Sequence, residues 1–221
     1  MLYQQLNIQP GVTAIIGSGG KTSTMLALAT QLPGTVVVCT TTHIKAPEEM
    51  PLYTGANCAD AAELLRKHRV ICVGSYTDEG KLTASPIPMA DLAQTADYVL
   101  VEADGSKRLP LKAHLSHEPV IPQEAVCTIM LVGVSAFGKP VQEVAHRLER
   151  FCELAQMQPE EFVQPLHAAR VIQAEALCDL VLVNQVETET DLQLAKELAA
   201  CLPQYPVFAA AVRNNRCQKI Q

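Results

Sequence analysis

The residues best suited to chemistry lie near the N-terminus, in a glycine-rich segment that ends in a lysine and two hydroxyl side chains. An apolar run, Val12–Ile16, leads into this segment, and a helical pattern follows it. Backbone N–H groups in such a turn, together with the positive end of a helix, attract a multiply charged anion. The segment therefore predicts a phosphate-binding loop made of Gly17, Ser18, Gly19, Gly20, Lys21, Thr22 and Ser23.

The lysine and the hydroxyl of this loop have distinct predicted roles. Lys21 is expected to reach the β- and γ-phosphates of a nucleotide as a catalytic residue, and Thr22 to bind Mg²⁺. The usual spacing of such loops needs a glycine at position 15, where the chain has Ile15, so this loop is shorter and resembles that of Mur-type amide ligases. A plain glycine turn at the end of a strand is the alternative interpretation. Replacing Lys21 with Ala is expected to abolish nucleotide binding and to leave the fold intact.

A second candidate segment, Tyr98–Lys107, is an apolar strand pattern that ends in acidic residues. Glu102 comes directly after the apolar run, and Asp104 follows on the same side at strand spacing. A carboxylate at such a place binds Mg²⁺ directly or through water. We therefore expect Thr22, Glu102 and Asp104 to be metal ligands and Asp104 to be catalytic as well. An acidic turn without a metal is the alternative.

Two further polar segments follow apolar runs, and ligands of open α/β sheets bind at such strand ends. In Thr40-Thr41-Thr42-His43, the histidine is expected to orient a water molecule or contact the γ-phosphate as a catalytic residue. Asn184, Gln185 and Glu187 resemble the Asn-Lys-x-Asp motif that reads guanine, with Gln in place of Lys and Glu in place of Asp. These three residues are expected to contact the nucleotide, and ATP and GTP both stay open. A Thr-rich strand end and a polar loop are the alternatives.

Other charged residues gather after the second segment. Two histidines lie three residues apart in a proline-flanked loop, which indicates a polar loop rather than a metal site because further ligands are lacking; they are His114 and His117, next to Glu118. Three positive side chains suit either an anionic substrate or a solvated loop; they are Lys107, Arg108 and Lys112.

The elements that must position these residues follow from hydrophobic patterning. Continuous apolar runs predict strands covered on both faces, at Val12–Ile16, Thr35–Cys39, Val70–Val73, Tyr98–Val101, Cys127–Val132, Leu180–Val183 and Val207–Ala211. Helical patterns lie between several of them, at Thr22–Gln31, Asp60–His68, Pro88–Gln94, Val144–Ala155 and Thr190–Leu202. This alternation predicts an α/β fold, a three-layer P-loop NTPase-like domain with a mainly parallel sheet, which spans residues 1–221 as a single unit. Residues 143–174 show helical patterns without a strand, which predicts a small helical insertion or a long crossover.

Composition narrows the function classes. A net charge of −6 argues against nucleic acid as a partner. No apolar run is long enough for a membrane span, and the N-terminus lacks the basic and apolar regions of a signal peptide. The eight cysteines are scattered singly, which indicates neither a zinc site nor a disulfide scaffold and favours buried thiols in the reducing cytoplasm. A selenium- or metal-handling role for one of them stays open.

Several of these segments, taken together and in order, resemble a known family. They are Ile16–Ser23, Thr40–His43, Val101–Ser106, His117–Pro122 and Asn184-Gln185. The combination resembles the selenium-dependent molybdenum hydroxylase accessory proteins, the YqeC-like family of selenium cofactor biosynthesis, from about residue 10 to about residue 212. The resemblance implies a cytoplasmic bacterial protein that helps to mature molybdenum hydroxylases with a labile selenium, and it leaves the reaction itself undefined.

Three functional hypotheses follow from the loop and the resemblance together. The first is a protein that binds and hydrolyses a Mg²⁺-nucleotide, ATP or GTP, during maturation of the hydroxylase. The second is a nucleotide-switched partner protein that docks on a molybdenum hydroxylase or on its cofactor-maturation machinery. The third is a carrier that holds a molybdopterin-type phosphorylated cofactor without hydrolysis.

Overall fold

The apolar runs of the sequence form the centre of one large sheet in the computed structural model, which describes residues 1–221. Every strand of this sheet is parallel to its neighbours except the last, which runs antiparallel. The spatial order is β13 (Arg216–Lys219), β12 (Val207–Ala211), β11 (Leu180–Asn184), β9 (Ala125–Gly133), β1 (Gly11–Gly17), β7 (Tyr98–Glu102), β2 (Val36–Thr40), β4 (Val70–Val73) and β3 (Leu52–Tyr53). The prediction of an α/β fold with a mainly parallel sheet is confirmed.

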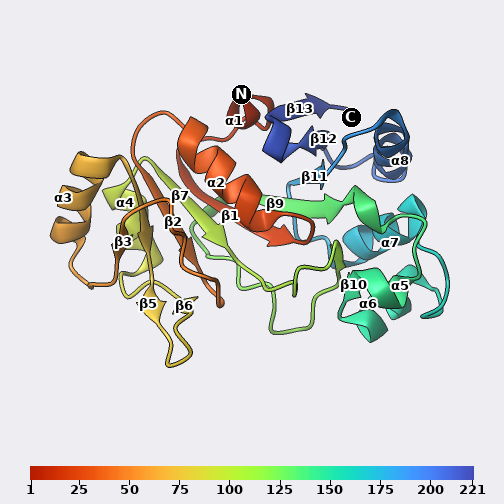
Figure 1. Ribbon diagram of the computed structural model, residues 1–221, viewed down its shortest axis with the longest axis horizontal. Coiled ribbons are helices and arrows are strands. Elements are labelled where there is room, and N and C mark those ends of the chain that lie inside the picture. Colours follow the sequence, from red (N-terminus) through yellow and green to blue (C-terminus); the bar gives the residue numbers. More distant parts are fainter.

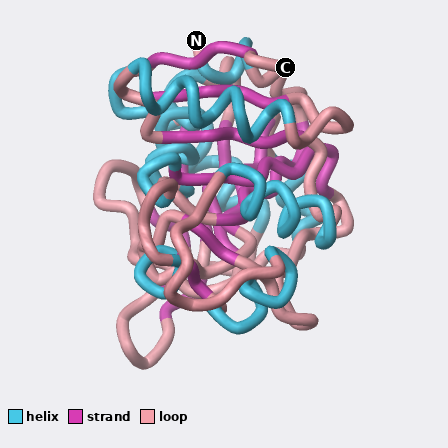
Figure 2. Tube along the Cα trace, turned by 90° about the vertical axis from the view of Figure 1, so that its right-hand side faces the viewer, coloured by secondary structure: helices cyan, strands magenta, loops and turns pink.

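Helices cover both faces of the sheet, which makes three layers (Figure 1). One face carries α1 (Leu2–Gln5) and α2 (Lys21–Gln31). The opposite face carries two groups of helices: α3 (Cys58–His68) and α4 (Met89–Thr95) beside β4 and β7, and α6 (Leu148–Ala155), α7 (Pro165–Glu175) and α8 (Glu189–Ala200) beside β9 and β11. Figure 2 shows the strands in the interior with helices and loops around them. This double covering explains why the central strands are buried along almost their whole length and are mostly apolar, rather than apolar at alternate positions.

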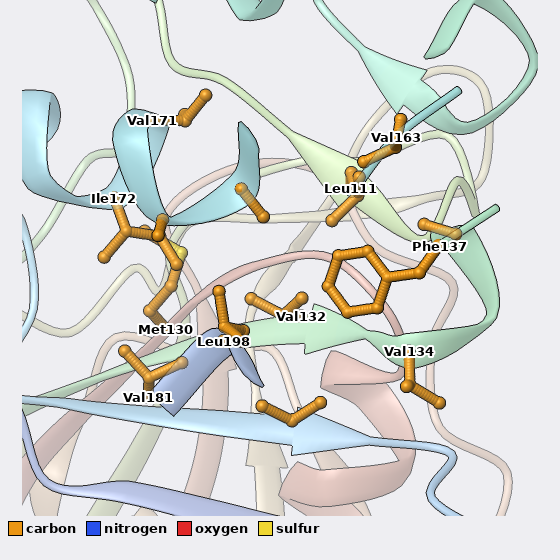
Figure 3. Close-up of a cluster of buried hydrophobic side chains, with 14 of the residues drawn as sticks. Leu111, Met130, Val132, Val134, Phe137, Val163, Val171, Ile172, Val181 and Leu198 are labelled. Atoms are coloured by element: carbon orange, nitrogen blue, oxygen red, sulfur yellow. The ribbon is translucent and has the colours of Figure 1, made fainter. Parts of the chain in front are cut away.

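Alternate side chains of each strand enter different layers of the core. In β1, Ile15 packs with α2, whereas Ala14 and Ile16 face the opposite layer. Figure 3 shows part of that opposite layer, where Met130 and Val132 of β9 lie against side chains of α7 and α8. The chain thus leaves β1 toward one face and leaves the neighbouring β9 toward the other. Such a divergence at the carboxyl ends of adjacent strands opens a crevice where ligands of α/β sheets bind.

Four of the helical patterns predicted from the sequence are present with shifts of one or two residues at their ends, and the pattern at Val144–Ala155 is a continuous helix only from Leu148. The last of the four begins at Glu189, because Thr188 caps it by accepting a hydrogen bond from the Asp191 N–H. The segment 143–174, predicted to lack a strand, contains a two-residue strand, β10 (Ala145–His146), between α5 (Val141–Val144) and α6. This strand pairs with β8 (Leu111–Lys112) and ties the helical segment to the chain beyond β7.

Several short elements could not be predicted from the hydrophobic pattern of the sequence. They are β5 (Ser75–Tyr76), β6 (Leu82–Thr83) and the 3₁₀ turns η1 (Val134–Ala136) and η2 (Val212–Asn214). The chain closes with η2 and the polar edge strand β13 rather than with a helix. No helix has the length and apolar character needed to cross a lipid bilayer.

The thiols differ from the expectation of buried cysteines. Cys39 and Cys72 are buried, while the other six are only partly so, and all eight are free. Burial raises the pKa of Cys72 to about 12, and that of Cys178 likewise to about 12, so both are neutral thiols at neutral pH. No cysteine thiol is a partner in the side-chain hydrogen bonds of Lys21, Thr22 or Asp104 described next.

Candidate functional site

The glycine-rich segment connects the end of β1 at Gly17 with the start of α2 at Lys21. Gly20, the residue before the helix, has a left-handed backbone, and no side chain caps the helix. The N–H groups of the first helical turn therefore have neither an intrahelical acceptor nor a side-chain cap. An uncapped first turn concentrates partial positive charge, which suits an anion.

Two glycines of the loop are required by its close approach to β9. Gly17 has a φ of +84°, and a Cβ on it would lie 2.4 Å from the carbonyl oxygen of Leu131. Gly19 has a φ of +97°, and its Cβ would lie 2.3 Å from the backbone nitrogen of Gly133. Both contacts are with backbone, which cannot move aside as a flexible side chain can. The loop is thus seated against the neighbouring strand, and its path is set by that packing.

Lys21 is held inside the loop by two oxygen atoms. Its ammonium donates to the carbonyl oxygen of Gly17 at 2.6 Å and lies 2.9 Å from Oδ1 of Asp104. The side chain of Lys21 is 3% exposed, and that of Asp104 is fully buried. Glu102 is a more distant partner, with Oε1 at 4.0 Å from the ammonium. The structure therefore brings together the lysine of the first predicted segment and the acids of the second.

Thr22 and Glu102 form the pair best placed for a cation. The Thr22 hydroxyl donates to Oε2 of Glu102 at 3.1 Å. Burial raises the pKa of the Glu102 carboxyl above its ordinary value, although the charge of Lys21 and the hydrogen bond from Thr22 oppose this. A hydroxyl and a carboxylate are oxygen ligands of the kind that Mg²⁺ prefers. The oxygens of Asp104, the third predicted ligand, face other groups.

Asp104 lies beneath the loop and is surrounded by donors. Its Oδ2 accepts from the Gly17 N–H at 2.8 Å and lies 2.7 Å from Nε2 of His114. Burial by itself raises the pKa of the Asp104 carboxyl, but the hydrogen bond from His114 and the charges of Lys21 and Lys112 outweigh it, so this pKa lies below its ordinary value. Asp104 is therefore an ionised carboxylate at neutral pH.

His114 is buried between two carboxylates, contrary to the expectation of a polar loop histidine. Its Nδ1 lies 2.7 Å from Oε2 of Glu175, on α7, opposite the contact of Nε2 with Asp104. Burial lowers the pKa of His114, but the hydrogen bonds to Asp104 and Glu175 outweigh it and raise this pKa above its ordinary value. Its predicted neighbour His117 is exposed. The two histidines thus have unrelated environments, and they do not form a metal site.

A branch of ion pairs connects Asp104 with the helical segment. Lys112 lies 3.6 Å from Oδ2 of Asp104 and also pairs with Glu118. Glu118 in turn accepts from Nε of Arg147 at 2.6 Å, at the residue that precedes α6. Burial raises the pKa of Glu118, but Lys112 and Arg147 outweigh it and bring this pKa below its ordinary value. Lys112 therefore belongs to a buried network rather than to a solvated loop.

A cavity of about 410 Å³ lies beside the loop at the carboxyl ends of β11 and β12. It brings Gly20 and Ser23 of the loop next to the predicted base-side residues Asn184, Gln185 and Glu187. The remaining lining residues include Val134, Ser135, Thr188, Asp191, Val212 and Arg213. The two segments, which are far apart in the sequence, thus border one hollow.

The Asn184 side chain is hydrogen-bonded to the loop and is not free to bind a ligand in this cavity. Its amide donates to the carbonyl oxygen of Gly19 at 2.8 Å and accepts from the Val212 N–H at 3.2 Å. Gln185 accepts from the Ser135 hydroxyl at 2.7 Å. Glu187 is exposed, and its carboxylate makes no hydrogen bond or ion pair. Of Asn184, Gln185 and Glu187, it is therefore the residue whose side chain is available to accept a hydrogen bond from a ligand.

The threonine segment after β2 lies beside Glu102. The Thr40 hydroxyl donates to the carbonyl oxygen of Glu102 at 2.8 Å, and the Thr41 N–H bonds to the same oxygen at 3.2 Å. His43 is exposed and makes no hydrogen bond or ion pair with the loop. The structure therefore places the threonines beside Glu102 and gives His43 no contact with the loop.

Sequence reasoning missed residues that the fold brings to the site from a distance. Glu175 and Arg147 come from the helical segment, and Ser135 and Arg213 come from the 3₁₀ turns. Each is a single polar residue without a motif around it. A charged residue at the end of an apolar helix, such as Glu175, is the one weak signal, since such a side chain needs a partner when buried.

Comparison with known proteins gives a consistent match. Residues 13–149 match the family described as YqeC protein. A protein of Escherichia coli (strain K12), printed as uncharacterized protein YqeC, is 33% identical over 168 residues. This similarity covers 71% of the chain and 65% of the E. coli protein. The family match includes the glycine-rich loop, the threonine segment and the acidic segment, and it ends before the predicted base-side residues.

Proposed function

The chain belongs to the YqeC protein family, and we propose that it binds a Mg²⁺-nucleotide, ATP or GTP, at the loop Gly17–Ser23 and hydrolyses it. The observation that carries this proposal is the loop itself. An uncapped helix start, a lysine and a hydroxyl converge at the carboxyl end of a central strand. This combination suits a chain of phosphates and Mg²⁺ better than it suits a neutral ligand. A P-loop NTPase-like fold is part of the same proposal.

The residues fit a Mg²⁺ ion next to the first turn of α2. Thr22 and Glu102, whose oxygens lie 3.1 Å apart, would hold the ion. Asp104, beneath the loop, would add negative charge near it. When bound, the Mg²⁺-nucleotide supplies an activated phosphoryl group. Lys21 neutralises charge on the β- and γ-phosphates by turning from Asp104 toward them, and the loop N–H groups orient the chain of phosphates. His43, the third predicted catalytic residue, would orient a water molecule or contact the γ-phosphate from the segment after β2.

The base and ribose occupy the cavity beside the loop in this proposal. Its volume of about 410 Å³ lies within the range of small-molecule sites. Val134 and Val212 offer apolar contacts to a base, while Gln185 and Glu187 offer polar ones. The cavity admits both ATP and GTP as candidates.

The biological role in the proposal is maturation of selenium-dependent molybdenum hydroxylases in the cytoplasm, with the hydroxylase or its cofactor-maturation machinery as partner. The sequence resemblance described above supports this role. The branch of ion pairs from Asp104 through Lys112 and Glu118 to Arg147 favours a second candidate, a nucleotide-switched partner protein. These contacts join Asp104, beneath the loop, to the helical segment 141–175, so a ligand at the loop could change how that segment is held.

Calorimetric titration tests the proposal. ATP and GTP, each with and without Mg²⁺, are titrated into the wild-type chain and into Thr22→Val, which keeps the side-chain shape but loses the hydroxyl. Thr30→Val, a change of an exposed threonine on the same helix, is the matched control. We expect Mg²⁺-dependent binding that Thr22→Val weakens about tenfold or more and Thr30→Val leaves unchanged.

The outcomes separate the hypotheses. Binding followed by release of phosphate supports hydrolysis. Release of phosphate only when the molybdenum hydroxylase or its maturation proteins are added supports the nucleotide-switched partner protein. Binding of a pterin dinucleotide without release of phosphate replaces the hydrolytic proposal with the carrier. An absence of binding at millimolar nucleotide contradicts the proposal.

A further inference from the structure

A line of buried side chains runs from the phosphate loop to α7. Lys21 contacts Asp104 at 2.9 Å, Asp104 contacts His114 at 2.7 Å, and His114 contacts Glu175 at 2.7 Å. None of the four side chains is more than 5% exposed. Proposed nucleotide binding uses the first two, which leaves His114 and Glu175 without a role. Buried charged groups are costly to keep, so a specific arrangement of them calls for an explanation.

We infer that His114 and Glu175 are positioning residues that hold Asp104 against the phosphate loop and thereby set the affinity of that loop for phosphate. This inference deepens the proposed function and rests on it for the affinity part. The positioning part, which concerns Asp104 and the Gly17 N–H, stands on the geometry of the chain alone.

Glu175 fixes the imidazole at two points. Its Oε1 accepts from the backbone N–H of His114 at 2.6 Å, and its Oε2 faces Nδ1 at 2.7 Å. These two contacts set the plane of the ring and direct Nε2 toward Oδ2 of Asp104. The same oxygen accepts the Gly17 N–H at 2.8 Å, so the carboxylate is held in the position that supports the loop. A short path of hydrogen bonds therefore joins the end of α7 to the first residue of the loop.

The arrangement also explains how Lys21 becomes available for an anion. A carboxylate with no solvent contact binds a neighbouring ammonium tightly in a medium of low dielectric constant. Both ring nitrogens of His114 face carboxylate oxygens, so the ring donates a hydrogen bond to Asp104 as well as to Glu175. With that donor and Lys112 beside it, Asp104 keeps partners when Lys21 turns toward a phosphate. Without the histidine, Asp104 would retain Lys21 and compete with the ligand.

The test compares two acidic residues of the helical segment. Glu175→Gln keeps the size of the side chain and removes its charge, and Glu175→Asp keeps the charge on a shorter arm. Glu153→Gln, on the neighbouring α6, is the matched control, because Glu153 is 68% exposed and pairs only with Arg150. Two quantities are measured for each variant: the amide ¹⁵N–¹H resonance of Gly17, and the affinity for Mg²⁺-ATP and Mg²⁺-GTP.

We expect Glu175→Gln to move the Gly17 resonance upfield, as the hydrogen bond to Asp104 lengthens, and to weaken nucleotide binding about tenfold. Glu175→Asp should recover part of both effects, and Glu153→Gln should change neither. A Glu175→Gln variant that melts at a lower temperature but keeps the Gly17 resonance and the affinity would overturn the inference, because Glu175 would then only stabilise α7. His114→Gln gives a second route to the same readouts.

The experiment also separates this inference from the proposed function. If the wild-type chain binds no nucleotide, the proposed function fails, while the Gly17 resonance still tests whether Glu175 positions Asp104. If the wild-type chain binds nucleotide and Glu175→Gln binds equally well, the proposed function stands and the inference fails.

Discussion

Replacement of Lys21 by Ala should destabilise the fold as well as remove the proposed phosphate contact. The sequence alone predicts an intact fold for this variant. The structure leads to a different expectation, because the Lys21 ammonium lies 2.9 Å from a carboxylate of Asp104 that has no exposure to solvent. Removing the ammonium leaves Asp104 buried with one partner fewer.

The size of the effect follows from the surroundings of Asp104. Loss of one partner from a buried ion pair typically costs about 3–5 kcal/mol of unfolding free energy. His114 and Lys112 remain beside the carboxylate, so the lower end, about 3 kcal/mol, applies here. For a chain of this length, that loss corresponds to a melting temperature lower by about 6–12 °C.

Urea unfolding measures this difference directly. Lys45→Ala is the matched control, because Lys45 pairs with Glu48 at 2.6 Å but its side chain is 82% exposed. Because solvent screens that exposed pair, its loss should change stability little. The double variant Lys21→Ala with Asp104→Asn should recover part of the loss, with a coupling of about 2 kcal/mol, since the uncompensated charge is gone. A Lys21→Ala variant as stable as Lys45→Ala would refute the reasoning and show that the lysine is not paired in the fold.

Two further predictions concern the loop and the buried network. Gly19→Ala should have an unfolding free energy lower than that of Gly80→Ala by about 2 kcal/mol or more, measured by urea unfolding. Both glycines have a positive φ, but only a Cβ on Gly19 would meet backbone, at 2.3 Å. Unfolding free energy should also depend on pH in two windows. The contribution of Asp104, whose pKa lies below the ordinary 3.8, is present above that pH and is lost as the pH falls through the lowered value, so Asp104→Asn should flatten the acid limb of a stability profile. The contribution of His114, whose pKa lies above the ordinary 6.5, is complete below that pH and is lost as the pH rises through the raised value, and a profile of His114→Gln that keeps this loss would contradict the assignment.

Much of the fold could be predicted because the central strands are covered on both sides. β2 and β12 are buried at every position; β12 is an uninterrupted apolar run, and β2 is one up to its last residue, Thr40. By contrast, β13 is a polar edge strand, and β8 and β10 have two residues each. Short strands and edges contribute too few apolar residues to create a period, so only the folded chain reveals them.

The candidate site likewise contains residues that the sequence predicts and residues that only the folded chain brings together. The loop and the acidic end of β7 each carry a local motif at the carboxyl end of a strand, and β1 and β7 are neighbours in the sheet. Glycine spacing and an acidic strand end were therefore enough to predict Lys21, Glu102 and Asp104 as neighbours, although the two segments lie about 80 positions apart. His114 and Glu175, 61 positions apart, belong to no such pair of motifs. No spacing rule connects such residues, because their meeting depends on how α7 packs on the sheet.

Backbone amide resonances of the wild-type chain, followed during titration with Mg²⁺-ATP and Mg²⁺-GTP, show whether a nucleotide binds at the loop Gly17–Ser23. We predict that the amides of Gly19, Gly20 and Lys21 shift first and saturate with a single affinity, followed by those around Gln185. Saturable shifts that leave these loop amides unmoved, or no shift at millimolar nucleotide, would contradict the account.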